Sequence, residues 1–97
     1  MNPTRAILTI TGSDGTGGSG VQADIRFISQ LGGVAASAIT SITVQNTLGI
    51  QEFYDLPASM VRQQVEAIIN DLQPQVVKLG LLRRIDVVEA VAEVLSH

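Results

Sequence analysis

Apolar and polar positions alternate along this chain of 97 residues in short blocks, some with the spacing of strands and some with that of helices. Runs rich in apolar and β-branched residues predict four strands, at residues 6–10, 34–44, 49–54 and 75–82. Runs with helical spacing predict three helices, at residues 21–31, 57–72 and 84–95. The predicted order is therefore β-α-β-β-α-β-α, with 34–44 as one long buried strand.

Apolar strands separated by helices are typical of a mostly parallel sheet with helices on both faces. The predicted fold class is thus α/β, with three α-β-α layers. Such sheets bind ligands beyond the carboxyl ends of their strands. That rule directs attention to three segments, residues 11–20, 45–47 and 80–82.

Composition adds a constraint on the surroundings of the chain. Hydrophobic residues make up 45% and charged residues only 15%, against about 25% charged residues in a typical soluble domain. No long uncharged apolar stretch of the transmembrane kind is present, and the N-terminal apolar run is too short for a signal peptide. We therefore expect a cytoplasmic chain that does not span a membrane and is either part of a larger fold or an obligate oligomer.

Several kinds of site are disfavoured by residue type. The chain has no Cys, which excludes a disulfide, a Cys-based zinc site or a thiol nucleophile within these residues. The single Lys and the scattered Arg residues form no basic stripe, and only three aromatic residues could stack on bases. Nucleic acid is therefore not an expected partner. The single His is His97, a poor position for a general base. We predict no metal ligands and no catalytic residue here.

The most distinctive segment is a glycine-rich loop between the first strand and the first helix. Residues 15–20 match the pattern G-x-G-x-x-G of dinucleotide-binding folds. However, that reading needs an acidic residue about 20 positions later, and none occurs between Asp24 and Glu52. Asp14 before the loop would repel a pyrophosphate. A P-loop is excluded because Gly18 stands where Lys is required.

A plain turn would need only one or two glycines, and each additional one costs roughly 0.5–1 kcal/mol of backbone entropy. We therefore expect something to approach the loop backbone closely. The free N–H groups at the start of the following helix would favour an anionic or electron-rich group.

Three polar features should meet at this end of the sheet. Asp24 lies on the otherwise apolar face of the first helix, where by itself it is best explained as a stabiliser of the helix dipole. Gln45 and Asn46 end an apolar strand, which by themselves could be a simple polar turn. Together with the glycine loop, they could recognise the donors and acceptors of a small heterocycle. Lys78, in the middle of a strand, is either a paired lysine or a ligand contact.

Three motifs resemble those of one known family. They are G-S-D-G-T-G-G-S-G-V-Q-A-D at residues 12–24, S-I-T-V-Q-N-T at 41–47 and K-L-G-L-L at 78–82. In this order they are similar to the hydroxymethylpyrimidine/phosphomethylpyrimidine kinases of thiamine biosynthesis, members of the ribokinase-like superfamily. Ser19 replaces the usual Ala, Gly15 stands where Pro or Ser is common, and Leu81 replaces a Met that contacts the pyrimidine.

The resemblance implies a substrate-binding set formed by Gly12, Asp14, Ser19, Asp24, Gln45 and Leu81. Gly12 and Ser19 would line the pyrimidine pocket, Asp24 and Gln45 would hydrogen-bond the aminopyrimidine and its hydroxymethyl group, and Leu81 would pack on the ring. The glycines would then let the backbone lie against a flat heterocycle.

The resemblance also implies which functions belong to the two parts of the kinase domain. Residues 1–97 correspond to the N-terminal, acceptor-substrate part of the family's kinase domain, whereas the catalytic base and the sites for ATP and Mg²⁺ lie in its C-terminal half. The full-length protein would be the kinase, and the 97-residue chain is expected to be inactive alone. It is expected to form a homo-oligomer or to associate with that other half. The alternatives are a pyridoxal-type vitamin kinase, a non-catalytic small-ligand binding module and, least favoured, half of a nicotinamide oxidoreductase.

Overall fold

The computed structural model describes residues 5–96, so His97 lies outside the described part. The strands are β1 (Ala6–Thr11), β2 (Val34–Ile39), β3 (Ser41–Asn46), β4 (Gly49–Asp55) and β5 (Val76–Leu79). The helices are α1 (Gly20–Gln30), α2 (Ala58–Leu72) and α3 (Ile85–Leu95). Each predicted helix is present, with bounds shifted by a few residues at most.

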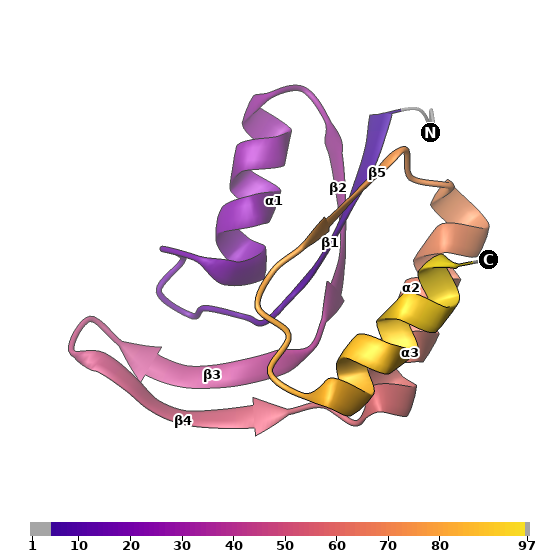
Figure 1. Cartoon of the computed structure of the whole chain (residues 1–97). Coiled ribbons are helices and arrows are strands. Elements are labelled where there is room, and N and C mark those ends of the chain that lie inside the picture. The colour runs from indigo at the N-terminus through magenta and orange to yellow at the C-terminus, as the bar shows by residue number, and fades with distance from the viewer. Residues whose placement is uncertain (1–4, 97) are drawn as a thin grey trace.

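A parallel three-stranded sheet in the order β2-β1-β5 forms the centre of the fold. Helix α1 lies on one side of it and helices α2 and α3 lie on the other, which confirms the three-layer arrangement (Figure 1). The main core lies on the α2–α3 side. Its fully or nearly fully buried side chains are Leu8, Ile10, Ala36, Ala38, Val61, Val65, Val87 and Val91. Among residues 5–96, no helix combines the length and the apolar character needed to cross a bilayer.

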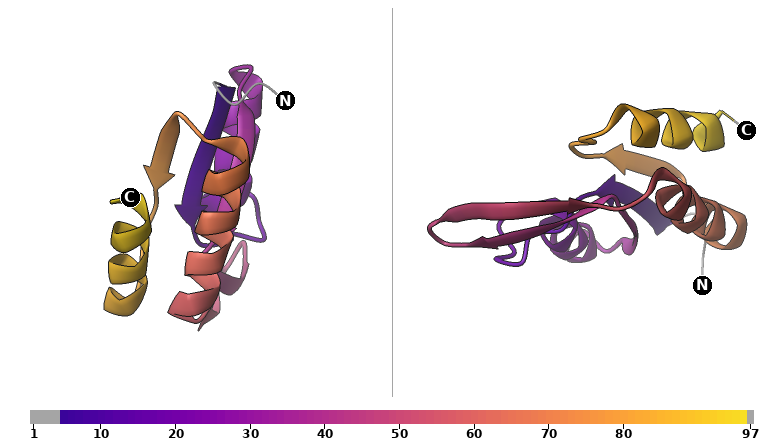
Figure 2. Two further views of the ribbon diagram at one scale, coloured as in Figure 1. Left: turned by 90° about the vertical axis from the view of Figure 1, so that its right-hand side faces the viewer. Right: turned by 90° about the horizontal axis from the view of Figure 1, so that it is seen from below.

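The prediction of one buried strand at 34–44 is wrong. The chain leaves the parallel sheet at Thr40 and continues as β3, which pairs with β4 in an antiparallel ribbon. This ribbon projects sideways from the layered body (Figure 2). Ile42 and Val44, expected in the core, are each 47% exposed.

Hydrogen bonds at Thr40 explain the break. Its N–H donates to the carbonyl of Thr11 at the end of β1 (3.0 Å), and its carbonyl accepts from the N–H of Leu56 (3.0 Å). The chain is therefore held between two strands that run in different sheets. A parallel return was excluded in any case, because the connection between β3 and β4 is much shorter than the dozen or so residues that a crossover requires.

Candidate functional site

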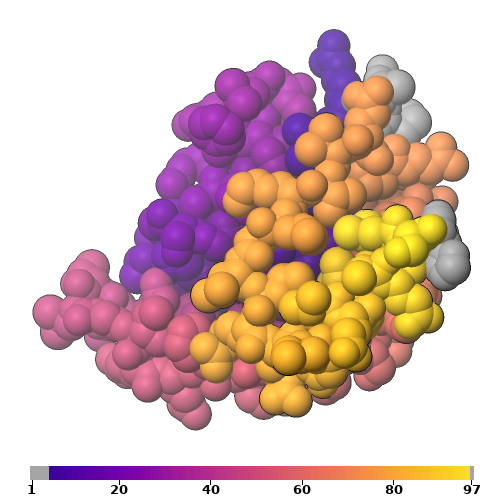
Figure 3. All heavy atoms as spheres, viewed as in Figure 1, coloured from indigo at the N-terminus to yellow at the C-terminus, as the bar shows by residue number. Residues whose placement is uncertain are grey.

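The carboxyl ends of β1 and β5 and the start of β3 surround a cavity of about 340 Å³. All six residues of the predicted substrate-binding set line it: Gly12, Asp14, Ser19, Asp24, Gln45 and Leu81. They come from the glycine loop, α1, the ribbon and the segment after β5. In Figure 3 the purple loop and the pink ribbon lie beside the orange segment on the same face. The cavity thus lies at the end of the sheet to which the rule of strand ends points.

Asp14 organises the glycine loop from within. Its side chain is only 4% exposed. One carboxylate oxygen accepts from the N–H and hydroxyl of Thr16 (2.9 and 2.7 Å) and from the amide nitrogen of Gln45. The other accepts from the N–H and hydroxyl of Ser19 (2.8 and 2.9 Å). The loop is therefore wrapped around its own acidic residue.

These hydrogen bonds also control the charge of Asp14. The hydroxyl and N–H of Thr16, followed by the corresponding groups of Ser19, stabilise the carboxylate and outweigh the opposing effect of desolvation. They lower the pKa of Asp14 from 3.8 to about 2. Asp14 is consequently ionised at neutral pH although it is buried.

The packing of the protein itself favours glycine at two positions of the loop. A Cβ on Gly12 would lie 2.7 Å from the hydroxyl oxygen of Ser41, so the serine side chain would have to move to admit it. Gly20 has a φ of +65°, and a Cβ on it would lie 2.6 Å from the carbonyl oxygen of Gly12. Close approach to a ligand is therefore not needed to explain either position.

The start of α1 is less available to a ligand than the sequence suggested. The N–H of Val21 donates to the carbonyl of Gly12 (2.9 Å), and the N–H of Ser19 donates to Asp14. The glycine loop itself thus takes up two donors that were expected to face an anion.

Asp24 joins three elements of the fold. Its carboxylate accepts from the hydroxyl of Thr9 on β1 (2.6 Å) and from the ammonium group of Lys78 on β5 (2.9 Å to each oxygen). Burial raises the pKa of Asp24, but these two partners more than compensate, so its pKa lies below the usual value. The side chains of Asp24 and Lys78 are 15% and 54% exposed, respectively.

Two interpretations from the sequence are settled by these contacts. Asp24 is not a first-turn residue, because the first turn of α1 has no acidic residue. Its role as a dipole stabiliser is therefore excluded in favour of the pairing across the sheet. Lys78 is a paired lysine that also lines the cavity, although it is not buried.

The two amides that end β3 have different environments. Gln45 reaches Asp14 and lines the cavity. Asn46 accepts from the N–H of Leu48 (2.9 Å), outside the cavity, and so closes the turn of the ribbon. The simple polar turn is thus the right explanation for Asn46 but not for Gln45.

The ribbon supplies cavity residues that the sequence analysis missed. Thr43 donates its hydroxyl to the carbonyl of Ser13 (2.6 Å) and fixes β3 on the loop. Phe53 lines the cavity under Arg83, whose guanidinium lies 3.7 Å from the ring centroid and bonds Asp55 (2.8 Å). The sequence carried one signal for these residues. The connection between the strand-like runs at 34–44 and 49–54 is so short that the two runs can pair only as an antiparallel ribbon.

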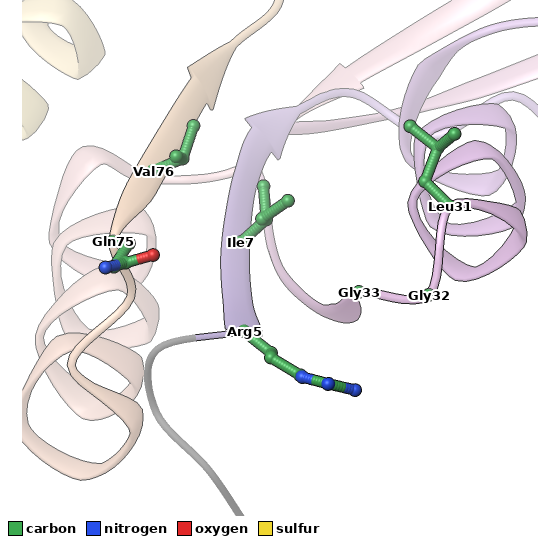
Figure 4. A pocket seen from close by; sticks show the side chains of 7 residues that line it. All are labelled: Arg5, Ile7, Leu31, Gly32, Gly33, Gln75 and Val76. Carbon is green, nitrogen blue, oxygen red and sulfur yellow. The ribbon is translucent and has the colours of Figure 1, made fainter.

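A second hollow lies at the opposite end of β1 and β5, as Figure 4 shows. Its volume is about 370 Å³, and its lining contains Arg5 as the one charged residue together with Ile7, Leu31, Gly32, Gly33, Gln75 and Val76. None of the predicted site residues lies there. Within residues 5–96, no group of three or more His, Cys, Asp or Glu side chains could hold a metal ion.

Comparison with known proteins gives a consistent result. A sequence model of the family described as phosphomethylpyrimidine kinase matches residues 14–97. A hydroxymethylpyrimidine/phosphomethylpyrimidine kinase of Bacillus subtilis is 47% identical over 85 residues, which cover 88% of this chain and 31% of that protein. The chain spans about a third of the length of the curated kinases that it matches, with values of 31%, 36% and 31% for three of them.

Solved structures show the same fold. A phosphomethylpyrimidine kinase from Clostridium difficile superposes with a TM-score of 0.91 at 38% identity, covering 94% of this chain and 39% of that one. A pyridoxal kinase from Staphylococcus aureus, in complex with AMP-PCP and pyridoxal, has a TM-score of 0.84 at 26% identity, covering 96% and 35%.

The glycine geometry predicts a sharp contrast between two substitutions in one loop. Gly20→Ala should destabilise the fold by at least about 1–2 kcal/mol, because it imposes a left-handed conformation on a residue with Cβ and creates a backbone clash. Gly15→Ala is the matched control, since its Cβ meets nothing within 4 Å, and it should change stability by less than about 0.5 kcal/mol. Urea unfolding measures both, and equal midpoints would contradict this account of the loop.

The pKa of Asp14 predicts a particular acid response. Because the folded state lowers this pKa from 3.8 to about 2, the unfolded chain takes up the proton more readily. The ionised carboxylate therefore stabilises the fold fully above about pH 4, and this contribution disappears as the pH falls toward 2. Urea midpoints of the wild type and Asp14→Asn between pH 6 and pH 2 should converge at the acidic end. Parallel curves would show that Asp14 does not titrate in this window. The pKa values of Asp24 and Asp86 are also lowered, that of Asp86 chiefly by its hydrogen bond with Arg84, but both residues are present in both proteins and their contributions cancel.

Proposed function

Because the chain belongs to the phosphomethylpyrimidine kinase family, we propose that it forms the acceptor-substrate side of an ATP-dependent kinase of thiamine biosynthesis. The kinase would phosphorylate 4-amino-5-hydroxymethyl-2-methylpyrimidine and then its monophosphate. The observation that carries the proposal is that the six residues of the substrate-binding set, expected from the sequence motifs, all line one cavity at the carboxyl ends of the strands.

The chemistry of the cavity suits an aminopyrimidine. Such a ring offers N–H donors on its amino group, acceptors on its ring nitrogens and two flat apolar faces. Asp24 would accept from a donor of the ligand beside its bonds to Thr9 and Lys78, and Gln45 offers an amide. Leu81, whose side chain is 74% exposed, would cover a face of the ring.

In the proposed reaction the hydroxymethyl oxygen attacks the γ-phosphorus of ATP, the bond to the β–γ bridging oxygen breaks and ADP leaves. The alcohol proton would pass to a base supplied by another part of the kinase or to water. Catalysis of this kind depends mainly on positioning and charge stabilisation. We assign residues 5–96 the positioning of the acceptor and no catalytic base. ATP and Mg²⁺ belong to the proposal for the whole protein, and no step is assigned to a metal here because no described cluster fits one. The cytoplasmic location stays a prediction.

A pyridoxal-type vitamin kinase is the second candidate. The superposition on a pyridoxal kinase solved with AMP-PCP and pyridoxal favours it. The pyrimidine is preferred because the kinases named for it are more similar in sequence, at 47% and 38% identity against 26%.

We predict that Asp24→Ala and Gln45→Ala each weaken binding of the hydroxymethylpyrimidine, by about 1–3 kcal/mol, because each removes a hydrogen-bonding partner of the ring. The loss should be larger for Asp24, which is charged. Titration calorimetry on the protein expressed from its complete coding sequence tests this, with ATP as a second ligand whose affinity should stay unchanged. Asp71→Ala, at an exposed position on α2, is the control. Normal pyrimidine affinity in both cavity variants, or tighter binding of pyridoxal than of pyrimidine by the wild type, would contradict the assignment.

We also propose that the open edge of β5 is covered by a further strand, from a second copy or from another segment of the same protein. Among the described strands, β5 pairs with β1 alone, and Val76 on it is 51% exposed. An apolar groove of about 720 Å³ beside this edge is lined mainly by residues of α1 and β5, including Phe27, and by Leu31 directly after α1. Open strand edges and uncovered apolar surface both favour association.

The 97-residue chain should therefore sediment as more than a monomer at micromolar concentration. Val76→Lys should shift it toward monomer, because a lysine on an edge strand opposes pairing. Leu48→Lys is the control, since Leu48 is already 94% exposed at the tip of the ribbon. A monomeric wild type would refute the prediction.

A further inference from the structure

The carboxylate of Asp14 has no capacity left for a ligand. A carboxylate offers about four lone-pair sites, and Asp14 accepts five donors from Thr16, Ser19 and Gln45. The residue is only 4% exposed, which leaves little room for water at these sites. Although Asp14 lines the cavity, its effect on a bound molecule must be transmitted by the groups that it holds.

Of these groups, only the amide of Gln45 has two possible orientations with opposite chemistry. Its oxygen is an acceptor and its nitrogen is a donor, and a half-turn about the last side-chain bond exchanges them. An ionised carboxylate can only accept, so the amide nitrogen must face Asp14. The reverse orientation would place two acceptors against each other in a buried site, which is costly.

With its nitrogen fixed in this way, Gln45 retains one acceptor, Oε1, and one further N–H. This pair matches an edge on which an amino group stands beside a ring nitrogen, as amide side chains match the N6 and N7 atoms of adenine. In the same ring orientation it does not match the reversed edge of an oxo-pyrimidine, because the carbonyl would face Oε1 and the ring N–H would face the amide N–H. An amide free to turn could bind either edge.

We propose that Asp14 is a positioning residue that determines substrate specificity. It locks the amide of Gln45 so that the cavity selects an amino–ring nitrogen edge over an oxo–ring N–H edge. The specificity part of this inference rests on the proposed function, whereas the lock itself does not.

The lock is tested first without any ligand, by NMR of the protein expressed from its complete coding sequence. The side-chain N–H signals of Gln45 are identified by their absence in Gln45→Ala. In the wild type, one of the two protons should be shifted downfield and should exchange slowly with water, because it is bonded to a carboxylate. Asp14→Ala should abolish both properties.

Thr16→Val is the matched control. It removes one hydroxyl donor from the same carboxylate oxygen, while Thr16 is exposed and lies outside the cavity lining. The Gln45 signal should stay as in the wild type. Asp14→Asn is a second variant in case Asp14→Ala does not fold. Its neutral amide oxygen is a weaker acceptor than a carboxylate and its amide nitrogen accepts nothing, so the Gln45 signal should weaken in either orientation of the asparagine.

Specificity is then measured as the ratio of dissociation constants for 4-amino-5-hydroxymethyl-2-methylpyrimidine and its 4-oxo analogue. Asp14→Ala should reduce the preference for the amino compound on the order of tenfold, while Thr16→Val should change it by less than about twofold. Because Asp14 acts through Gln45, the double variant Asp14→Ala/Gln45→Ala should show no greater loss than Gln45→Ala alone. A merely structural role would instead make the two losses multiply.

The outcomes separate the two proposals. A Gln45 signal that is unshifted in the wild type, or unchanged in both Asp14 variants, overturns the lock. An altered signal with an unchanged amino preference overturns the specificity role. If the wild type binds neither pyrimidine, the proposed function fails, and a shifted signal that depends on Asp14 would still support the lock.

Discussion

The buried carboxylate of Asp14 joins the segments that enclose the cavity. It holds Thr16 in the glycine loop, Ser19 at the start of α1 and Gln45 on the ribbon. Burying a charge without partners is costly, so the surrounding backbone must supply donors from several directions. The loop can curve tightly enough to do so because Gly17 and Gly20 take positive φ values. The acidic residue and the glycines around it are therefore parts of one structural device.

Hydrogen bonds from the loop directly after β1 hold the ribbon in place. The N–H of Ser13 donates to the carbonyl of Ser41 (2.9 Å), and Thr43 donates its hydroxyl back to the carbonyl of Ser13 (2.6 Å). They hold the backbone at Gly12 so close to Ser41 that a Cβ there would lie 2.7 Å from the serine hydroxyl oxygen. The departure of the chain from the sheet after β2 thus brings Gln45 to Asp14 and makes the ribbon one wall of the cavity.

The ion pair of Asp24 and Lys78 connects the cavity to the layered body. Asp24 is on α1, Lys78 is on β5, and Thr9 between them on β1 bonds the same carboxylate. Because the lysine is 54% exposed, the pair contributes little to stability. Its main effect is to keep Asp24 ionised and oriented. Both residues also line the apolar groove between α1 and β5. The ion pair therefore separates this groove from the cavity that holds the candidate site residues.

The sequence by itself determined the number and approximate bounds of the helices, the three-layer class and the end of the sheet where the six candidate residues meet. Those features follow from residue periodicity and from the rule that parallel strands present their carboxyl ends together, which are local or general properties. Only the tertiary structure decided that the run at 34–44 divides at Thr40, that Asp14 binds Gln45 and that Asp24 pairs with Lys78. The two side-chain contacts join residues 31 and 54 positions apart. They depend on strand register and on where the chain turns, and hydrophobic spacing along the sequence carries no information about either.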